Sequence, residues 1–154
     1  MDDDNFDKMI ENIQKKIDLE EEKTYSKIVI KEYRNPTHFG DLKKPDTIGQ
    51  IKGSCGDTMI FSLKIVNNII KDARFWTDGC GPSVASGNIL AKMSIGKTIK
   101  DAEEVTSKTL LNALHGLPKE HKHCAVLAIN TLRKAIKNYE KNKNISGRNK
   151  WKLL

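Results

Sequence analysis

The sequence is poor in aromatic residues and cysteines, and it has no long apolar segment. Aromatic residues make up 6% of its 154 residues. No apolar run approaches the roughly 20 residues that a membrane-spanning helix needs. The start, Met1-Asp2-Asp3-Asp4, lacks the basic and apolar segments of a secretory signal. These absences predict a cytoplasmic protein whose length suits one domain with a core of its own.

The sequence has three cysteines, and this odd number would leave one of them unpaired in a disulfide framework. In a reducing compartment three thiols are more typical of metal binding or catalysis. Cys55, Cys80 and Cys124 stand far apart in the chain, so they do not form the paired knuckles of a compact zinc finger. The thiols are therefore expected to come from three separate elements.

The formal charge of +7 is concentrated near the C-terminal end, although no nucleic-acid-binding signature accompanies it. We interpret residues 141–154 as a basic, solubilising tail without helical periodicity. Such a tail binds polyanions only electrostatically and without sequence specificity. The basic residues of this end are Lys134, Lys137, Lys141, Lys143, Arg148, Lys150 and Lys152.

Residues 1–27 are expected to form an amphipathic N-terminal helical segment. Over positions 5–20 the apolar residues recur at helical spacing, which predicts one apolar face that docks on the body of the domain or on a partner. A second helical segment, around Tyr25 to Tyr33, must end by Asn35, because the residue before Pro36 is disfavoured in a helix. The face consists of Phe6, Met9, Ile10, Ile13 and Ile17.

A loop over 36–46 should precede a short strand at 47–53 and a hairpin. Met59, Phe61, Leu63 and Ile65 alternate as in a half-buried strand. Asn67-Asn68 suits a two-residue turn, because asparagine tolerates positive φ. The return strand runs from Ile69 to Thr77, with Lys71, Ala73, Phe75 and Thr77 on one face. Since an antiparallel pair returns the chain to its origin, Cys55 and Cys80 should be neighbours.

The remaining chain is predicted to be helical. One helix opens at Pro82 and stops near Gly96, and capping residues at Thr98 and Thr106 or Ser107 open two shorter ones. A last helix is expected from about His121 to Tyr139, with Cys124 in its first turn. Cys80 and Cys124 thus lie at helix starts, where the helix dipole favours the thiolate. Gly79 and Gly81 are expected to give clearance around the Cys80 sulfur.

These positions define a candidate metal site. Thiolates are the ligands that zinc, copper(I) and iron–sulfur clusters prefer. Three thiolates with one carboxylate or imidazole complete a four-coordinate site or hold a [2Fe–2S] cluster. A harder fourth ligand than thiolate should make such a cluster easier to release. The candidate ligands are Cys55, Asp57, Cys80, His123 and Cys124.

Several stretches, in order over roughly residues 28–140, resemble the U-type iron–sulfur cluster scaffolds, namely IscU and the N-terminal domain of NifU. The specific signal is the combination of Cys-Gly-Asp, Gly-Cys-Gly and His-Cys segments. The matching stretches are Tyr33-Arg34-Asn35-Pro36, Gly53-Ser54-Cys55-Gly56-Asp57, Asp72-Ala73-Arg74-Phe75, Gly79-Cys80-Gly81-Pro82, Ala85-Ser86, Gly96-Lys97-Thr98, Leu117-Pro118 and His123-Cys124-Ala125-Val126-Leu127-Ala128.

The resemblance implies a single α+β domain over residues 28–140, with a three-stranded antiparallel sheet packed by about four to six helices. It implies a scaffold, not an enzyme, that receives sulfur from a cysteine desulfurase and iron from a donor. An electron donor completes a [2Fe–2S] cluster, which passes to recipient apo iron–sulfur proteins. The cluster lies within one protomer or between the two of a homodimer, and zinc takes the same pocket in isolated scaffolds.

The resemblance also assigns roles to single residues. Cys55, Cys80 and Cys124 become cysteine ligands, and Cys124 matches the persulfide acceptor. Asp57 matches the aspartate that ligates the cluster or keeps it labile, and His123 the alternative ligand. The segment that Hsp70-type chaperones grip reads Leu-Pro-Pro-Val-Lys in the family. Here residues 117–121 read Leu-Pro-Lys-Glu-His, so only the first two positions agree.

Two alternatives accompany this interpretation. A zinc-bound sulfur acceptor of the SufU type would stimulate a desulfurase without building a cluster, but the spacing from Cys80 to Cys124 has no room for the insertion of that type. A cysteine hydrolase using Cys124 and His123 is disfavoured, because adjacent helical side chains point about 100° apart. His38, His115 and His121 are interpreted as surface residues, with His121 as a candidate supporting hydrogen-bond partner.

Overall fold

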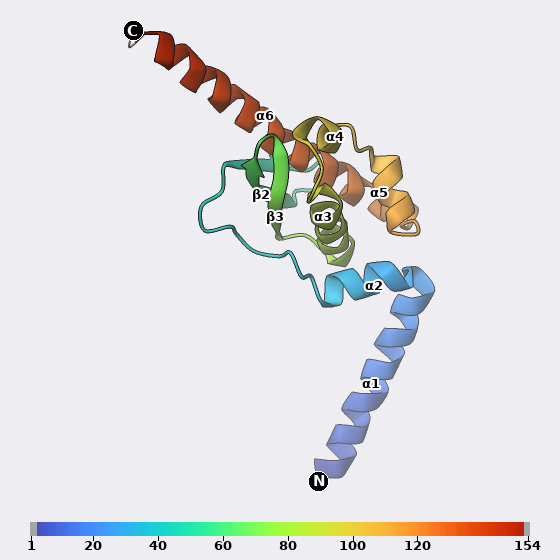
Figure 1. Ribbon diagram of the computed structural model, residues 1–154. Coiled ribbons are helices and arrows are strands. Elements are labelled where there is room, and N and C mark those ends of the chain that lie inside the picture. Colours follow the sequence, from blue (N-terminus) through green and yellow to red (C-terminus); the bar gives the residue numbers. More distant parts are fainter. Residues whose placement is uncertain (1–2, 153–154) are drawn as a thin grey trace.

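The computed structural model of the chain describes residues 3–152, with side chains described as far as Lys143. Figure 1 shows a small sheet with helices on one side and two long helices that leave the body in different directions. The elements in order are α1 (Asp3–Thr24), α2 (Lys27–Arg34), β1 (Thr47–Lys52), β2 (Thr58–Val66), β3 (Ile69–Thr77), α3 (Gly81–Ser94), α4 (Ile99–Glu103), α5 (Ser107–Ala113), the short 3-10 helix η1 (Lys119–His121) and α6 (Lys122–Lys152).

The three strands that the structure describes form an antiparallel sheet in the order β1-β2-β3, as predicted. The alternating residues of β2 point into the core, where Met59, Phe61 and Leu63 are fully buried. Asn67 and Asn68 have φ of 53° and 63°, so the predicted two-residue turn is confirmed.

The prediction that Lys71 shares one face of β3 with Ala73 and Phe75 is wrong, because Lys71 is exposed while those two residues are buried. The pairing shifts between Lys64 and Ile65, so that Ile65 pairs with Ile70 while Lys64 pairs with Asp72. Lys71 is therefore the extra residue of a β-bulge, which turns its side chain outward and lets Ile70 take the buried side. An alternation rule cannot foresee such an insertion, because the bulge changes the face halfway along the strand.

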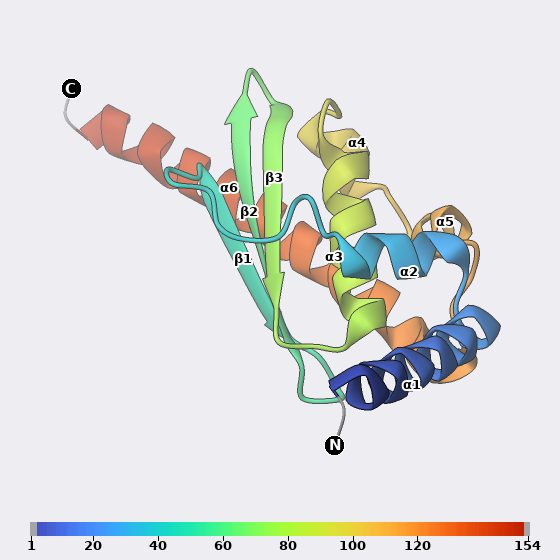
Figure 2. The ribbon, with the colours of Figure 1, turned by 90° about the horizontal axis from the view of Figure 1, so that it is seen from below.

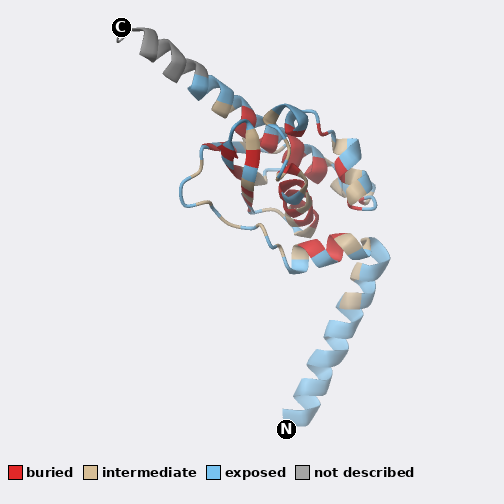
Figure 3. Cartoon of the chain, viewed as in Figure 1, coloured by how far each residue is buried: buried red, intermediate tan, exposed pale blue. Residues whose placement is uncertain are grey.

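Helices α6 and α3 cover one face of the sheet and seal the core (Figure 2). The first half of α6 packs on β1 and β2, and α3 packs on β3 and on α6. Leu127, Leu132 and Ile136 of α6 are buried there, as the predicted apolar stripe requires. Figure 3 shows that the buried residues gather in this layer between the sheet and the two helices.

Helix α2 is fixed to α3 through a buried charged group. Glu32 is 4% exposed and accepts hydrogen bonds from Asn88 and from Lys92, whose Nζ lies 2.9 Å away. A buried carboxylate needs such partners, because burial without them is costly. Helix α2 begins after the Ser26 cap and ends at Arg34, so the predicted stop before Pro36 is confirmed.

The prediction that α1 docks on the body is wrong over most of its length. The helix is present at Asp3–Thr24, but none of these residues is buried. Its apolar face, from Phe6 to Ile17, is 45% to 52% exposed, and the helix leads away from the body (Figure 3). Its attachment lies at the C-terminal end, where Arg34 of α2 pairs with Asp18 and Glu21.

Helix α6 is longer than predicted. We expected a helix to Tyr139 and a basic tail from Lys141 onward, whereas the helix continues to Lys152. The prediction relied on apolar periodicity, which a helix shows only where one of its faces packs on a core. The side chains of the expected tail beyond Lys143 lie outside the described residues. Within the part that the structure describes, no helix is long and apolar enough to cross a bilayer.

Candidate metal and sulfur site

Three metal-ligating side chains meet where helices begin. Cys80 stands at the N-cap of α3, His121 ends η1, and Cys124 lies in the first turn of α6. One ligand atom of each, two sulfurs and a ring nitrogen, lies within 4.8 Å of the others. We call these three residues the helical half of the site. Sequence reasoning brought the two thiols to helix starts, but it treated His121 as a surface residue.

The side chain of Cys80 is not used to cap its own helix. It makes no capping hydrogen bond to the first turn of α3, and Pro82 within that turn removes one backbone donor that would need a partner. The Cys80 residue is exposed. Its sulfur is therefore available to a ligand or to an incoming protein.

Cys124 is in a different state from the one that its helix position suggests. Its residue is 0% exposed, and the Ser83 hydroxyl donates a hydrogen bond to its sulfur over 3.2 Å. Burial raises the pKa of the Cys124 thiol to about 11, and the Ser83 hydrogen bond offsets only part of this shift. Burial thus outweighs the helix dipole that we expected to favour the thiolate. At neutral pH the free thiol is protonated.

Cys55 and Asp57 lie together in the loop between β1 and β2. Their Sγ and Oδ2 atoms are 3.4 Å apart, and the Cys55 residue is exposed while Asp57 is partly buried. We call these two residues the loop half of the site. The loop is closed by a hydrogen bond from the Gly53 N–H to the Asp57 carbonyl. Among the described residues, Cys55 and Asp57 lie outside the close group of Cys80, His121 and Cys124.

The two halves adjoin at Gly79, beside Cys80. A methyl group at Gly79 would lie 2.7 Å from the Ser83 hydroxyl and 3.1 Å from Asp57 Oδ2. At Gly81 it would lie 3.2 Å from the ring of Tyr33. The glycines therefore make room for the groups that surround the thiols, where we expected clearance for the Cys80 sulfur itself. Asp57 reaches Gly79, so the segments of Cys55 and Cys80 adjoin. The predicted contact of the two thiols themselves stays a prediction, because Cys55 lies outside the close group in the described residues.

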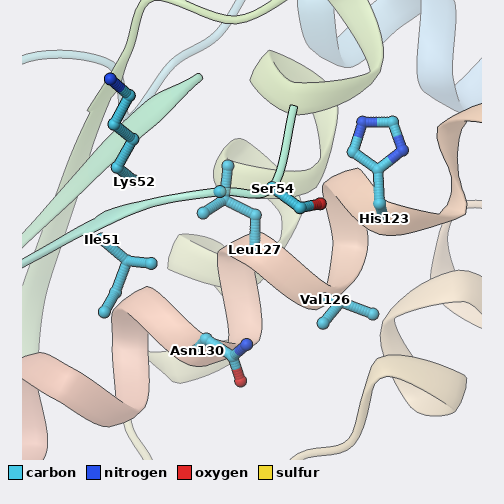
Figure 4. A pocket seen from close by; sticks show the side chains of 8 residues that line it. Ile51, Lys52, Ser54, His123, Val126, Leu127 and Asn130 are labelled. Atoms are coloured by element: carbon cyan, nitrogen blue, oxygen red, sulfur yellow. The ribbon is translucent and has the colours of Figure 1, made fainter. Parts of the chain in front are cut away.

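His123 lies beside Cys124 but outside the close group. Its Nε2 is 3.7 Å from the Cys124 sulfur, and its ring lines a pocket with Ser54, Val126 and Leu127. Figure 4 shows the ring near Ser54, the residue before Cys55. His123 is thus placed between the loop half and Cys124, and its assignment as a ligand stays a prediction.

His121 is held by a residue from the N-terminal part of the chain. The Tyr25 hydroxyl lies 3.4 Å from His121 Nε2, and the two ring centroids are 5.9 Å apart. Burial, followed by the nearby Cys80 and Cys124, raises the pKa of Tyr25, so its phenol stays neutral. His121 was missed because the sequence placed it at the surface, at the start of the last helix. The short 3-10 turn that aims its ring at the thiols leaves no periodic pattern in the sequence.

The other two histidines lie apart from this site. His115 is exposed and follows α5 with a positive φ of 59°. His38 Nδ1 lies 2.8 Å from the Thr37 hydroxyl. Neither belongs to the close group of ligand atoms in the described residues, as we expected for both.

Comparison with known proteins identifies similar chains. The family model described as NifU-like N terminal domain matches residues 24–146. The iron-sulfur cluster assembly scaffold protein IscU 1 of Archaeoglobus fulgidus is 37% identical over 116 residues, which cover 75% of this chain and 76% of that protein. The scaffold protein IscU of Aquifex aeolicus is 38% identical over 118 residues, 75% of each chain.

The fold is also found among solved structures. The N-terminal part of a nitrogen-fixing NifU-like protein from Brucella abortus matches with a TM-score of 0.60 at 20% identity. The match covers 75% of this chain and 94% of the solved one. The two chains therefore share their fold, a three-stranded antiparallel sheet covered by helices.

Proposed function

The chain belongs to the NifU-like N-terminal domain family, and from this we propose that it is a scaffold on which an iron–sulfur cluster is assembled and then handed on. Its relatives in Archaeoglobus fulgidus and Aquifex aeolicus are named as iron-sulfur cluster assembly scaffold proteins. A scaffold holds its product and does not turn it over, which fits a non-catalytic role. We place this function in the cytoplasm, because three free thiols suit a reducing compartment.

The observation that carries the proposal is the convergence of thiols from separate elements. Cys80 and Cys124 come from the starts of α3 and α6, and their sulfurs lie with a His121 nitrogen in one group of ligand atoms. The loop half adjoins it at Gly79. Soft thiolates with one harder ligand suit iron and sulfide while leaving the product exchangeable. We propose as ligands Cys55, Asp57, Cys80, His123 and Cys124, held by residues 28–140.

The cargo that we propose is a [2Fe–2S] cluster, with zinc occupying the same residues in protein isolated without iron. Iron, like zinc, binds the deprotonated form of cysteine. For Cys124, whose burial raises the pKa of its thiol to about 11, the metal must displace a proton. Binding should therefore release protons and strengthen as the pH rises.

Sulfur would arrive from a cysteine desulfurase as a persulfide. In this transfer a scaffold thiolate, for which we propose Cys124, attacks the outer sulfur of the persulfide. One S–S bond forms, another breaks, and the desulfurase cysteine leaves as a thiolate. The transferred sulfur must then be reduced to sulfide, so iron(II) ions supply part of the electrons and an electron donor supplies the rest. An iron donor and recipient apo iron–sulfur proteins complete the set of partners.

The burial of Cys124 gives this transfer a condition. A reactive nucleophilic cysteine has a lowered pKa, whereas burial raises the pKa of the Cys124 thiol to about 11. The thiol therefore needs to be deprotonated and uncovered by a bound metal or a docked desulfurase before it accepts sulfur. The same property argues against a free-standing cysteine hydrolase built on Cys124 and His123.

Anaerobic reconstitution tests the proposal. Reduced protein is supplied with iron(II) and a sulfur source, and the visible absorbance and iron and sulfide content are measured. We expect a cluster in the wild-type protein and its loss in Cys80→Ala, with Cys80→Ala still folded by circular dichroism. No cluster in the wild type, or an unchanged one in Cys80→Ala, would contradict the scaffold function. Stoichiometric zinc that iron and sulfide cannot replace would instead indicate a zinc-bound sulfur acceptor.

A further inference from the structure

We propose that His121 is a metal ligand of this chain, acting with Cys80 and Cys124, and that Tyr25 holds its ring in place. The inference deepens the proposed function, on which it rests only for the identity of the metal cargo. Resemblance to the scaffold family points to His123 as an imidazole ligand of the cluster. For a single bound metal ion, the geometry of this chain points to the histidine two positions earlier.

The first support is the spacing of the donor atoms. Ions bound tetrahedrally by sulfur and nitrogen at about 2.0–2.3 Å place their ligand atoms roughly 3.5–3.8 Å apart. The Cys80, His121 and Cys124 ligand atoms lie within 4.8 Å of one another before any ion draws them together. Only small side-chain rotations separate this arrangement from a three-ligand site with one position left for a fourth ligand. Among the residues that the structure describes, this is the group of cysteine, histidine and acidic ligand atoms that meets such a spacing.

The second support is the hydrogen-bond partner of the His121 imidazole. Histidines that bind metals generally donate their second ring N–H to an oxygen, which fixes both the tautomer and the orientation of the ring. The Tyr25 hydroxyl stands 3.4 Å from His121 Nε2 and can accept that hydrogen bond. Nδ1 then keeps its lone pair, and it is the ring nitrogen that we assign to a metal. A tyrosine phenol is neutral at physiological pH, so Tyr25 can play this part.

The third support is the contrast with His123. Its Nε2 approaches Cys124 to 3.7 Å, but its ring faces the pocket beside Ser54, and no nitrogen of it joins the close group with Cys80. The two imidazoles therefore have different positions: His121 faces the helical half, and His123 lies towards the loop half.

A purely structural role is the competing explanation for His121. Its ring packs at 5.9 Å from Tyr25 and 6.4 Å from His123, measured between centroids, so it could serve only as a spacer. A spacer would affect stability and would leave the ligand set of a bound metal unchanged. The test must therefore count ligands directly.

Cobalt(II) is a suitable probe because it substitutes for zinc and iron(II) and needs no sulfur donor. Reduced wild-type protein, the variants His121→Asn, His123→Asn and Tyr25→Phe, and the control His115→Asn are titrated anaerobically with cobalt(II). Affinity is read from sulfur-to-cobalt charge-transfer absorbance. X-ray absorption of the one-cobalt complexes then counts imidazole ligands from the scattering of the ring. Circular dichroism confirms that each variant is folded.

We expect His121→Asn to lower cobalt affinity about 100-fold and to remove the imidazole signal, and Tyr25→Phe to lower affinity about 10-fold with the imidazole kept. The matched control His115→Asn, at an exposed histidine outside the close group, should change affinity about twofold or less and should keep the imidazole. If His123→Asn removes the imidazole while His121→Asn keeps it, the inference is overturned. Cluster formation by the wild type is measured separately, so failure of the scaffold function would appear there and not in the cobalt data.

Discussion

The two halves of the site are held in different ways. In the helical half, Cys80 and Cys124 sit at the starts of α3 and α6, and His121 ends η1. Cys124 is fully buried against Ser83. In the loop half, exposed Cys55 rests on Asp57 in the connection between β1 and β2. A rigid half can fix the position of a metal, whereas a loop can move to admit iron and sulfur and to let a product leave. Assembly and release then depend on different residues.

The reactivity of the thiols towards iodoacetamide should show this difference most strongly. Burial raises the pKa of the Cys124 thiol from an ordinary 9.0 to about 11, which lowers its thiolate fraction at neutral pH about 100-fold. We expect Cys124 to react at least about 100-fold more slowly than Cys55 in the metal-free protein at pH 7.5, as measured by peptide mass spectrometry.

The same experiment has an internal control in denaturant, where the three thiols should react at similar rates. In the native protein, the rate at Cys124 should still rise tenfold per pH unit above pH 9, because burial raises the pKa of this thiol to about 11. The rate of an ordinary thiol levels off in that range. Equal rates at Cys55 and Cys124 in the native protein would remove the distinction between the two halves.

Metal affinity should separate the halves next. Cys124→Ala removes a ligand from the group whose atoms already lie within 4.8 Å, while Cys55→Ala removes one that must move towards it. We expect cobalt(II) affinity to fall about 100-fold in Cys124→Ala and about 10-fold in Cys55→Ala, measured by anaerobic titration. An equal loss in both variants would mean that the loop half is as well positioned as the helical half.

Gly79→Ala tests the junction of the two halves. The added methyl group would lie 2.7 Å from the Ser83 hydroxyl and 3.1 Å from Asp57 Oδ2, so these side chains must shift. We expect the free energy of unfolding to fall by about 1–3 kcal/mol, measured as a lower urea midpoint. Gly56→Ala is a matched comparison at a position with a φ of +92° and open space, where strain alone should act. Unchanged stability in Gly79→Ala would show that the contact between the halves is loose.

The smallest effect is expected from Asp57→Ala, which leaves the thiols in place. Since Asp57 offers a harder ligand than a thiolate, its loss should slow the release of a reconstituted cluster several-fold. The decay of visible absorbance in the presence of a chelator measures this lifetime. Asp78→Ala is a control, because Asp78 accepts a hydrogen bond from Thr58 N–H at the end of the same loop. A shorter lifetime in Asp57→Ala would make Asp57 a stabilising ligand.

Local patterns predicted most of the fold because each had one physical cause. The alternation in β2 reflects a sheet with one buried face, and the Asn67-Asn68 turn reflects a backbone that those residues tolerate. Where two causes compete, prediction failed. The bulge at Lys71 interrupts the alternation of β3. Helix α1 forms as predicted, but its apolar face stays exposed and does not pack on the core.

The site was predictable as a set of thiols but not as an arrangement. Cysteines at turns and helix starts can be read from the chain, and the antiparallel hairpin brings Asp57 close to Gly79. The place of His121 depends on a 3-10 turn and on Tyr25, which is 96 residues away in the chain. The pKa of Cys124 depends on how deeply α6 is packed. Neither is a local property of the sequence.

The outward course of α1 affects how the molecule behaves in solution. Its 22 residues span about 33 Å, while a compact domain of roughly 100 residues has a radius of gyration near 13 Å. With α6 leaving the body in another direction, the particle is elongated (Figure 1). An elongated monomer diffuses slowly and elutes early from a gel-filtration column calibrated with globular standards. Its apparent mass would therefore exceed its true mass, and the number of protomers should be taken from light scattering.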